Sequence, residues 1–220
     1  MSDTPNINPT RRDFFRTTGV TLGAASVFSI GAPAHAQKNE TLKVGLIGSG
    51  GRGGGATIEA LSADPDTQLF AVGDTFLDRI EDKLATLKKT KFTDRLVVDE
   101  EHKFTGFDAY KKVIDCCDVV ILATPPVFRP AHLAYAVEKG KHVFCEKPIA
   151  VDPKGVRSVI ETCKKAKAKN INIVSGLCYR YQFAKQDTIQ RIQDGVIGDI
   201  ITMQTSYNTG GLWHKGCDAS

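Results

Sequence analysis

The most informative stretch of this sequence reads Leu42-Lys43-Val44-Gly45-Leu46-Ile47-Gly48-Ser49-Gly50-Gly51-Arg52-Gly53. It predicts a short apolar strand that runs into the pattern Gly48-x-Gly50-x-x-Gly53 and is followed by a helix. A glycine turn between a strand and a helix lets the backbone approach a pyrophosphate closely, and the free N–H groups of the helix attract the phosphates. The order of strand, turn and helix therefore favours a dinucleotide-binding loop over a glycine-rich surface loop without a ligand.

Five residues of this loop are candidate cofactor contacts. Gly48, Ser49, Gly50 and Gly53 are predicted to form the cradle for the phosphates. Arg52 is predicted to meet a phosphate, and the alternative is an arginine that is simply solvated.

An acidic residue follows the next predicted strand. The apolar run 69–73 ends at Asp74, where a carboxylate can bind the ribose 2′-OH of the adenosine half. A carboxylate repels a 2′-phosphate, so Asp74 favours NAD as the cofactor. Arg79, one helical turn further on, keeps NADP as the alternative.

The first 36 residues are predicted to be removed from the mature protein. Residues 10–16 contain Arg11-Arg12 followed by aromatic residues, residues 17–30 are weakly apolar, and Ala34-His35-Ala36 is a small-x-small cleavage site. This order resembles a twin-arginine export leader, and it implies the twin-arginine export machinery as a partner and the periplasm as the destination. The apolar segment is shorter than the roughly 20 residues of a spanning helix, so no stable membrane anchor is expected.

Composition narrows the class of protein. Of the 220 residues, 41% are hydrophobic and 25% are charged, which is typical of a soluble globular protein. The net charge of +4 is too small to favour nucleic acid as a partner. The six cysteines include no C-x-x-C pair, so no metal site is predicted and no disulfide can be assigned. Most of them are expected to be buried as small hydrophobic residues.

Strands and helices alternate along residues 41–178. This alternation, with short loops, predicts a Rossmann-type α/β domain with a doubly wound parallel sheet. The helix after Asp152-Pro153 is expected to bury Val156, Val159, Ile160 and Cys163 and to end near Asn170. The other predicted strands are 118–123, 142–145 and 171–174, and the other predicted helices are 77–88, 107–114 (with Asp108 as a cap) and 130–140.

The pattern changes after residue 179. Residues 183–194 are predicted to be helical, and residues 199–207 alternate between apolar and polar side chains as a half-exposed strand does. One strand cannot form a sheet. Residues 179–220 are therefore interpreted as the start of an incomplete α+β domain that binds substrate and mediates oligomerisation, and the chain as the front part of a longer protein.

Two loops are predicted where strands end, at the edge of the sheet that binds ligands in such folds. Thr124-Pro125-Pro126 forms a rigid loop that suits packing beside a flat ring. In Glu146-Lys147-Pro148, the lysine can protonate or polarise a hydroxyl or carbonyl, and the glutamate can accept hydrogen bonds from a ribose. The alternative for this second loop is a surface ion pair at the end of a strand.

Taken in order, these motifs resemble the Gfo/Idh/MocA oxidoreductases, the group of glucose–fructose oxidoreductase and inositol dehydrogenase. The resemblance covers about residues 42–207. It rests on the glycine pattern at 48–53, Asp74, Ala123-Thr124-Pro125, His132, Glu146-Lys147-Pro148 and Gly195-x-Ile197-Gly198.

The resemblance implies a nicotinamide dinucleotide and hydride transfer at a carbinol carbon of a sugar, a polyol or a derivative. It implies that Lys147 is catalytic, reaches the reacting hydroxyl and also contacts the cofactor. It implies that Glu146 contacts the nicotinamide ribose and that Thr124 and Pro125 flank the cofactor. It further implies a cis peptide before Pro148 and a homo-oligomer for a full-length form. His132 is expected to face the cofactor site, with a satisfied structural histidine as the alternative.

One family feature does not occur in the sequence. The family's second domain carries an Asp-x-x-x-His pair, and none is found after Tyr179; His214 has Gly210 four positions before it. A dinucleotide-binding fragment or module without turnover is therefore an alternative. A short-chain dehydrogenase that uses Tyr181 and Lys185 is the weaker alternative, because the loop of such enzymes reads Gly-x-x-x-Gly-x-Gly. Export also predicts a tightly held cofactor, because a periplasmic enzyme has no free nicotinamide pool.

Overall fold

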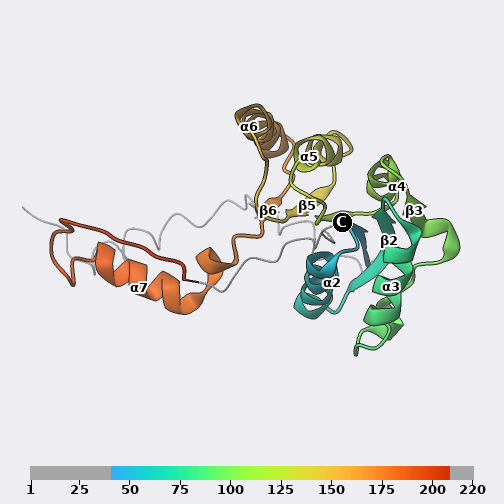
Figure 1. The fold of residues 1–220 in the computed structure, drawn as a ribbon, viewed down its shortest axis with the longest axis horizontal. Helices are drawn as coiled ribbons and strands as arrows, with labels where there is room; N and C mark the ends of the chain where they lie inside the picture. The colour runs from blue at the N-terminus through green and yellow to red at the C-terminus, as the bar shows by residue number, and fades with distance from the viewer. Residues whose placement is uncertain (1–40, 209–220) are drawn as a thin grey trace, which may run out of the picture. The chain divides into compact units, whose positions relative to one another are not determined.

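The computed structural model of the chain describes residues 41–208 (Figure 1). The predicted export leader, residues 1–36, lies outside the described residues, as do His214 and Cys217. Among the described residues, none of the helices combines the length and the apolar character needed to cross a membrane.

Six parallel strands form one sheet in the order β3-β2-β1-β4-β5-β6. The chain therefore winds outward in both directions from β1, and the fold class predicted from the sequence is confirmed. The order reverses between β1 and β4, and in open α/β sheets ligands bind in the crevice at the carboxyl ends of the strands on either side of such a reversal. The strands are β1 (Leu42–Ile47), β2 (Thr67–Asp74), β3 (Lys103–Thr105), β4 (Val119–Leu122), β5 (His142–Cys145) and β6 (Ile173–Ser175).

Helices cover both faces of the sheet, as Figure 1 shows. α2 and α3 pack on one face, and α4, α5 and α6 pack on the other. The helices are α2 (Gly51–Ala63), α3 (Leu77–Leu87), α4 (Ala109–Cys116), α5 (Arg129–Glu138), α6 (Pro153–Ala168) and α7 (Phe183–Gln193), with short 3₁₀ helices η1 (Thr93–Arg95), η2 (Glu100–His102) and η3 (Cys178–Tyr181).

The core consists of two apolar layers, one on each side of the sheet. Val44, Leu46 and Ile121 face α2 and α3, whereas Val120 and Leu122 face α4 and α5. Burial on both faces explains why the central strands read as continuous apolar runs in the sequence.

The prediction for α6 was only partly right. Asp152 caps the helix as expected, because its side chain accepts a hydrogen bond from the N–H of Gly155. Val159 is buried, but Val156, Ile160 and Cys163 are exposed, and the other buried positions of α6 are Thr162 and Ala166. The helix packs beside α5 near the edge of the sheet formed by β5 and β6, so only one narrow row of its side chains is covered.

The expectation for the cysteines needs a similar correction. Cys117 and Cys145 are buried, but Cys163 and Cys178 are exposed, and Cys116 is intermediate. These five thiols are free in the described part of the chain. The two buried thiols lie on β5 and in the turn between α4 and β4, whereas the two exposed thiols lie on α6 and η3.

The predicted strand at 199–207 does not form. Residues 201–208 have no regular secondary structure, and Ile201 is 93% exposed. A strand is stabilised by the backbone hydrogen bonds of a neighbouring strand, and no such neighbour exists for this segment among residues 41–208. The helix before it is confirmed as α7, and Gly195 follows it with a φ of 83°.

Two smaller differences concern the segment between α3 and α4. The sequence did not predict β3, which is only three residues long and follows two 3₁₀ turns. Asp108 stands at the N-cap position of α4 but makes no capping hydrogen bond, because its carboxylate pairs with Nζ of Lys111 at 2.7 Å.

The tight turn between β1 and α2 gives a test of this fold. A Cβ on Gly53 would overlap the carbonyl oxygen of Gly48, whereas a Cβ on Gly51 would meet no atom within 4 Å. We expect Gly53→Ala to lower the free energy of unfolding by more than about 3 kcal/mol. Gly51→Ala, the matched control, should change it by less than about 1 kcal/mol. Equal losses in urea unfolding of the two variants would contradict this packing.

Candidate functional site

The glycine turn brings three elements together at the carboxyl end of β1. Gly48 has a φ of +99°, which favours glycine, and a Cβ there would lie 2.7 Å from the backbone of Ala123 and Thr124. Gly53, in the first turn of α2, lies directly against the Gly48 carbonyl. The turn is therefore closed against both its own helix and the loop that follows β4.

The start of α2 is open toward the crevice. Its N-cap is Gly50, which offers no side chain, and the first turn contains no acidic residue. A Cβ on Gly50 or Gly51 would meet no atom within 4 Å, and the buried Oγ of Ser49 has no hydrogen-bond partner within the described residues. Uncapped N–H groups, open space and an unpaired hydroxyl together fit the pyrophosphate of a dinucleotide.

Asp74 lies beside this turn, at the end of β2. Its Oδ2 accepts a hydrogen bond from the backbone N–H of Ser49 at 2.7 Å, and its Oδ1 accepts one from the N–H of Phe76 at 3.3 Å. The structure therefore brings together the acidic residue and the glycine loop that the sequence predicted to act on one cofactor.

Glu146 follows β5 and is 3% exposed. Its Oε1 accepts a hydrogen bond from Nε of Arg52 at 2.5 Å, and its Oε2 accepts one from the N–H of Lys147 at 3.2 Å. Arg52 also donates to Glu59 at 2.8 Å, and hydrogen bonds to Glu59 and Glu146 raise the pKa of the guanidinium against the effect of its partial burial. Arg52 is thus an ion-paired bridge from α2 to the end of β5, and its contact with a phosphate stays a prediction.

Gly176 makes room for the Glu146 carboxylate. A Cβ on Gly176 would lie 2.9 Å from Oε2 and 3.0 Å from Oε1 of Glu146. This role could not be predicted from the sequence, because the contact joins the ends of β5 and β6.

Lys147 is exposed, next to the buried Glu146. Within residues 41–208 its ammonium group forms no ion pair. The Lys147–Pro148 peptide is cis, as the family resemblance implied.

The loop after β4 contains Thr124, which is partly buried, and Pro125, which is exposed. Behind Thr124 lies His132, which is 6% exposed, with Nδ1 3.4 Å from the Thr124 Oγ1. The imidazole stacks on Tyr110 with ring centroids 4.1 Å apart, and its burial lowers its pKa to about 4. His132 is therefore neutral at neutral pH and is packed like a structural histidine; its contact with a cofactor stays a prediction.

Arg129 is a site residue that the sequence did not single out. It is 4% exposed, and its guanidinium donates to the carbonyl oxygens of Thr124 and Pro148. Arg129 belongs to none of the sequence motifs. Its role follows only from its contacts with two loops that are distant in the sequence.

Tyr181 and Lys185 do not form a catalytic pair. Tyr181 is 59% exposed, and Nζ of Lys185 donates to the side chain of Gln182 at 2.6 Å. The structure therefore gives no support to a short-chain dehydrogenase.

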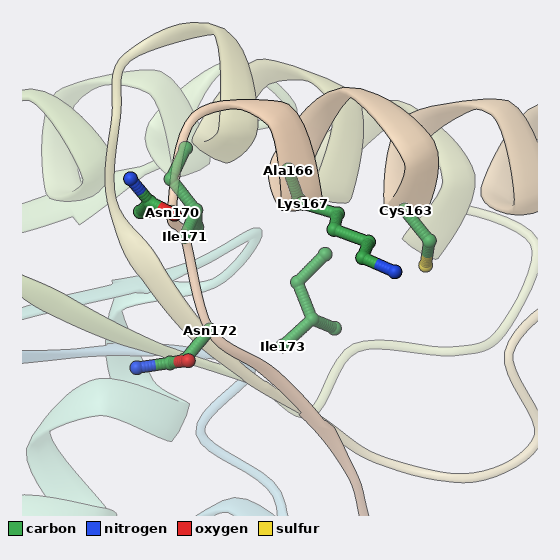
Figure 2. A pocket seen from close by; sticks show the side chains of 7 residues that line it. All are labelled: Cys163, Ala166, Lys167, Asn170, Ile171, Asn172 and Ile173. Carbon is green, nitrogen blue, oxygen red and sulfur yellow. The ribbon is translucent and has the colours of Figure 1, made fainter.

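A shallow pocket of 360 Å³ lies between the end of α6 and the start of β6 (Figure 2). Lys167 and Cys163 of α6 and Asn172 and Ile173 at the start of β6 are among its lining residues. It contains none of the predicted site residues, and it lies at the amino ends of the strands, opposite the edge that binds ligands in such sheets.

Comparison with protein families gives a match over most of the sheet. The model of an oxidoreductase family with an NAD-binding Rossmann fold, GFO_IDH_MocA, matches residues 42–173. Two curated relatives are glycosyl hydrolase family 109 proteins. That of Bacteroides thetaiotaomicron is 30% identical over 172 residues, covering 77% of this chain and 35% of the relative. That of Solibacter usitatus is 27% identical over 207 residues, covering 90% and 45%. The chain thus spans less than half of the length of these relatives.

Solved structures share the fold. Scyllo-inositol dehydrogenase from Lactobacillus casei, with bound NAD(H) and scyllo-inositol, has a TM-score of 0.58 at 21% identity, covering 72% of this chain and 43% of that one. Myo-inositol 2-dehydrogenase from Lactobacillus plantarum has a TM-score of 0.57 at 24% identity, covering 73% and 43%.

The buried His132 predicts a specific loss of stability in acid. Its pKa falls from 6.5 to about 4 on folding, so the unfolded chain takes up the proton first as the pH drops. The resulting destabilisation begins as the pH falls through 6.5 and is complete near pH 4. Between pH 7 and pH 5 it amounts to about 2 kcal/mol. His132→Gln, which cannot titrate, should lack this component in urea unfolding at the two pH values. The carboxyl groups titrate alike in wild type and variant, so any difference in pH dependence comes from His132. The same pH dependence in both proteins would contradict this assignment.

Proposed function

We propose a function for this chain from the premise that it belongs to the Gfo/Idh/MocA family of oxidoreductases. In this proposal the crevice at the carboxyl ends of β1 and β4 binds a nicotinamide dinucleotide, and the protein acts on a sugar, a polyol or a derivative of one. The observation that carries the proposal is the closed glycine turn, which leaves the N-terminus of α2 uncapped and places Asp74 beside it.

The adenosine half is assigned to the first two strands. The pyrophosphate would lie on the N–H groups at the start of α2, where Gly50 and Gly51 leave open space and the Ser49 hydroxyl lacks a partner. Asp74 would accept the ribose 2′-OH and repel a 2′-phosphate, so NAD is the proposed cofactor. Arg79, near the start of α3, keeps NADP as the alternative.

The nicotinamide half is assigned to the loops after β4 and β5. Thr124 and Pro125 would flank it, and Glu146 would accept hydrogen bonds from its ribose. When bound, the nicotinamide supplies a hydride acceptor or donor for a carbinol carbon. Lys147, exposed at the edge of this site, would hold or move the proton of the reacting hydroxyl.

The substrate class rests on the relatives. The inositol dehydrogenase structures support a polyol or sugar, and the glycosyl hydrolase relatives favour a second candidate, the hydrolysis of a glycoside. Hydrolysis involves no net oxidation, so a hydride removed during such a reaction must return to the substrate. The alignments cover 35% and 45% of these relatives, so both activities are proposed for the whole protein and not for residues 41–208 alone.

Export by the twin-arginine pathway to the periplasm remains part of the proposal and rests on residues 10–36 of the sequence. A periplasmic enzyme would need to retain its cofactor through successive turnovers. Homo-oligomerisation of a full-length form is proposed on the family resemblance alone.

Cofactor choice can be tested at Asp74. Asp74→Asn keeps an oxygen for the Ser49 N–H but removes the charge that disfavours a 2′-phosphate. We expect wild type to bind NADH in preference to NADPH, and Asp74→Asn to reduce this preference by about tenfold in a fluorescence titration. Asp78→Asn, an exposed carboxylate in the first turn of α3, is the matched control and should leave the preference unchanged. No binding of either nucleotide by wild type would overturn the proposed function.

Turnover can be tested at Lys147. In the presence of NAD and a panel of inositols and hexoses, wild type should produce reduced nicotinamide, and Lys147→Gln should do so at least about 100-fold more slowly. Its NADH affinity should stay within about threefold of wild type, as should that of the control variant Lys154→Gln. Cofactor binding by wild type without oxidation of any of these substrates would favour the binding module. Release of p-nitrophenol from p-nitrophenyl glycosides would favour the hydrolase.

A further inference from the structure

The side chain of Arg129 lies at the junction of the two loops that follow β4 and β5. Arg129 is the first residue of α5, and its side chain is almost fully buried. Nη2 donates to the carbonyl oxygen of Thr124 at 2.7 Å, and Nη1 donates to the carbonyl oxygen of Pro148. One rigid, planar group therefore joins the two loops.

Backbone hydrogen bonds connect the two segments only where the strands end. The N–H of Glu146 donates to the carbonyl of Leu122 at 3.0 Å, which extends the pairing of β4 with β5 by one residue. Beyond that point, Pro125, Pro126 and Pro148 have no N–H to donate. The described residues contain no further backbone hydrogen bond between the two loops. Arg129 thus supplies the donors that the prolines lack.

The charge of Arg129 also matters, because Glu146 is buried nearby. No carboxylate among residues 41–208 forms an ion pair with the guanidinium, and its Nε has no hydrogen-bond partner there. Burial lowers the pKa of Arg129 below its ordinary value, and the negative charge of the Glu146 carboxylate offsets only part of this effect. An arginine remains protonated in proteins, so a buried cation accompanies the buried carboxylate.

Arg95 also donates hydrogen bonds to backbone carbonyl oxygens, but in another part of the fold. Nη1 of Arg95 donates to the carbonyl oxygens of Asp64 and Thr67, and Nη2 donates to that of Leu61, at the end of α2. Arg95 therefore holds the end of a helix, away from the loops after β4 and β5. Arg95 is therefore a suitable control for the effect on stability of removing an arginine that binds carbonyl oxygens.

We propose that Arg129 is a positioning residue for the nicotinamide half of the cofactor. It fixes the loop of Thr124 and Pro125 at a set distance from the loop of Glu146 and Lys147, and so sets the width of the space between them. This inference rests on the proposed function, because it assigns these loops to the nicotinamide and its ribose. The hydrogen bonds of Arg129 go to the loops after β4 and β5, so the adenosine half is expected to depend on Arg129 less, even though the Gly48 turn packs against Ala123 and Thr124.

This separation of the two halves provides the test. NADH occupies both halves, whereas ADP occupies the adenosine half alone. Both affinities are measured by calorimetric titration of the 220-residue chain, under conditions in which circular dichroism shows each variant to be folded. Arg129→Met should weaken NADH binding by about tenfold or more and change ADP binding by less than about twofold.

Two further variants make the result specific. Arg129→Lys keeps the positive charge but lacks the planar guanidinium that donates to two carbonyls at once, so it should lose part of the NADH affinity. This variant also serves as the test if Arg129→Met does not fold. Arg95→Met should lower the stability without separating the NADH and ADP affinities. Loss of NADH and ADP affinity in proportion, or no loss of either, would overturn the role of Arg129. Wild-type protein that binds neither nucleotide would instead overturn the proposed function.

Discussion

The contact of the Gly48 turn with its neighbours is the constraint on which the rest of the structure depends. Gly53 of α2 lies against the Gly48 carbonyl, and Gly48 lies against the backbone of Ala123 and Thr124. The first contact directs the N-terminus of α2 toward the carboxyl end of β1. The second fixes the loop after β4 beside the same turn. A side chain at either glycine would separate the helix, the central strand and the loop on which the candidate site is built.

Around this turn the charged groups of the site are paired with one another or with backbone groups. Glu146 and Arg129 are buried, Asp74 is partly buried and Arg52 is exposed. An isolated carboxylate in such a place would be costly. Glu146 is satisfied by Arg52 and by the N–H of Lys147, and Asp74 is satisfied by the N–H groups of Ser49 and Phe76. Arg129 is satisfied by two carbonyls. These hydrogen bonds therefore join the glycine turn to the ends of β2 and β5, and the loop after β4 to the loop after β5.

The sequence was sufficient for the features that depend on local pattern. Apolar runs placed the central strands, and the glycine spacing placed the turn and Asp74 beside each other. It failed where burial depends on what packs outside an element, as for Ile160 of α6 and the segment 199–207. It also missed Gly176 and Arg129, because their roles arise from contacts between loops that are far apart in the sequence.

Arg52 and Glu146 form an ion pair in this structure, and the proposed cofactor would have to replace the hydrogen bond between them. A dinucleotide has anionic phosphates next to ribose hydroxyls, so it offers Arg52 an acceptor and Glu146 donors at the same time. Each hydrogen-bond partner lost from the ion pair would be replaced, and the buried Glu146 carboxylate would not be left without donors. Arg52 would also keep its second partner, Glu59, on the exposed side of α2. In this way Arg52 on the glycine loop and Glu146 after β5, which are 94 positions apart, could both contact one bound dinucleotide.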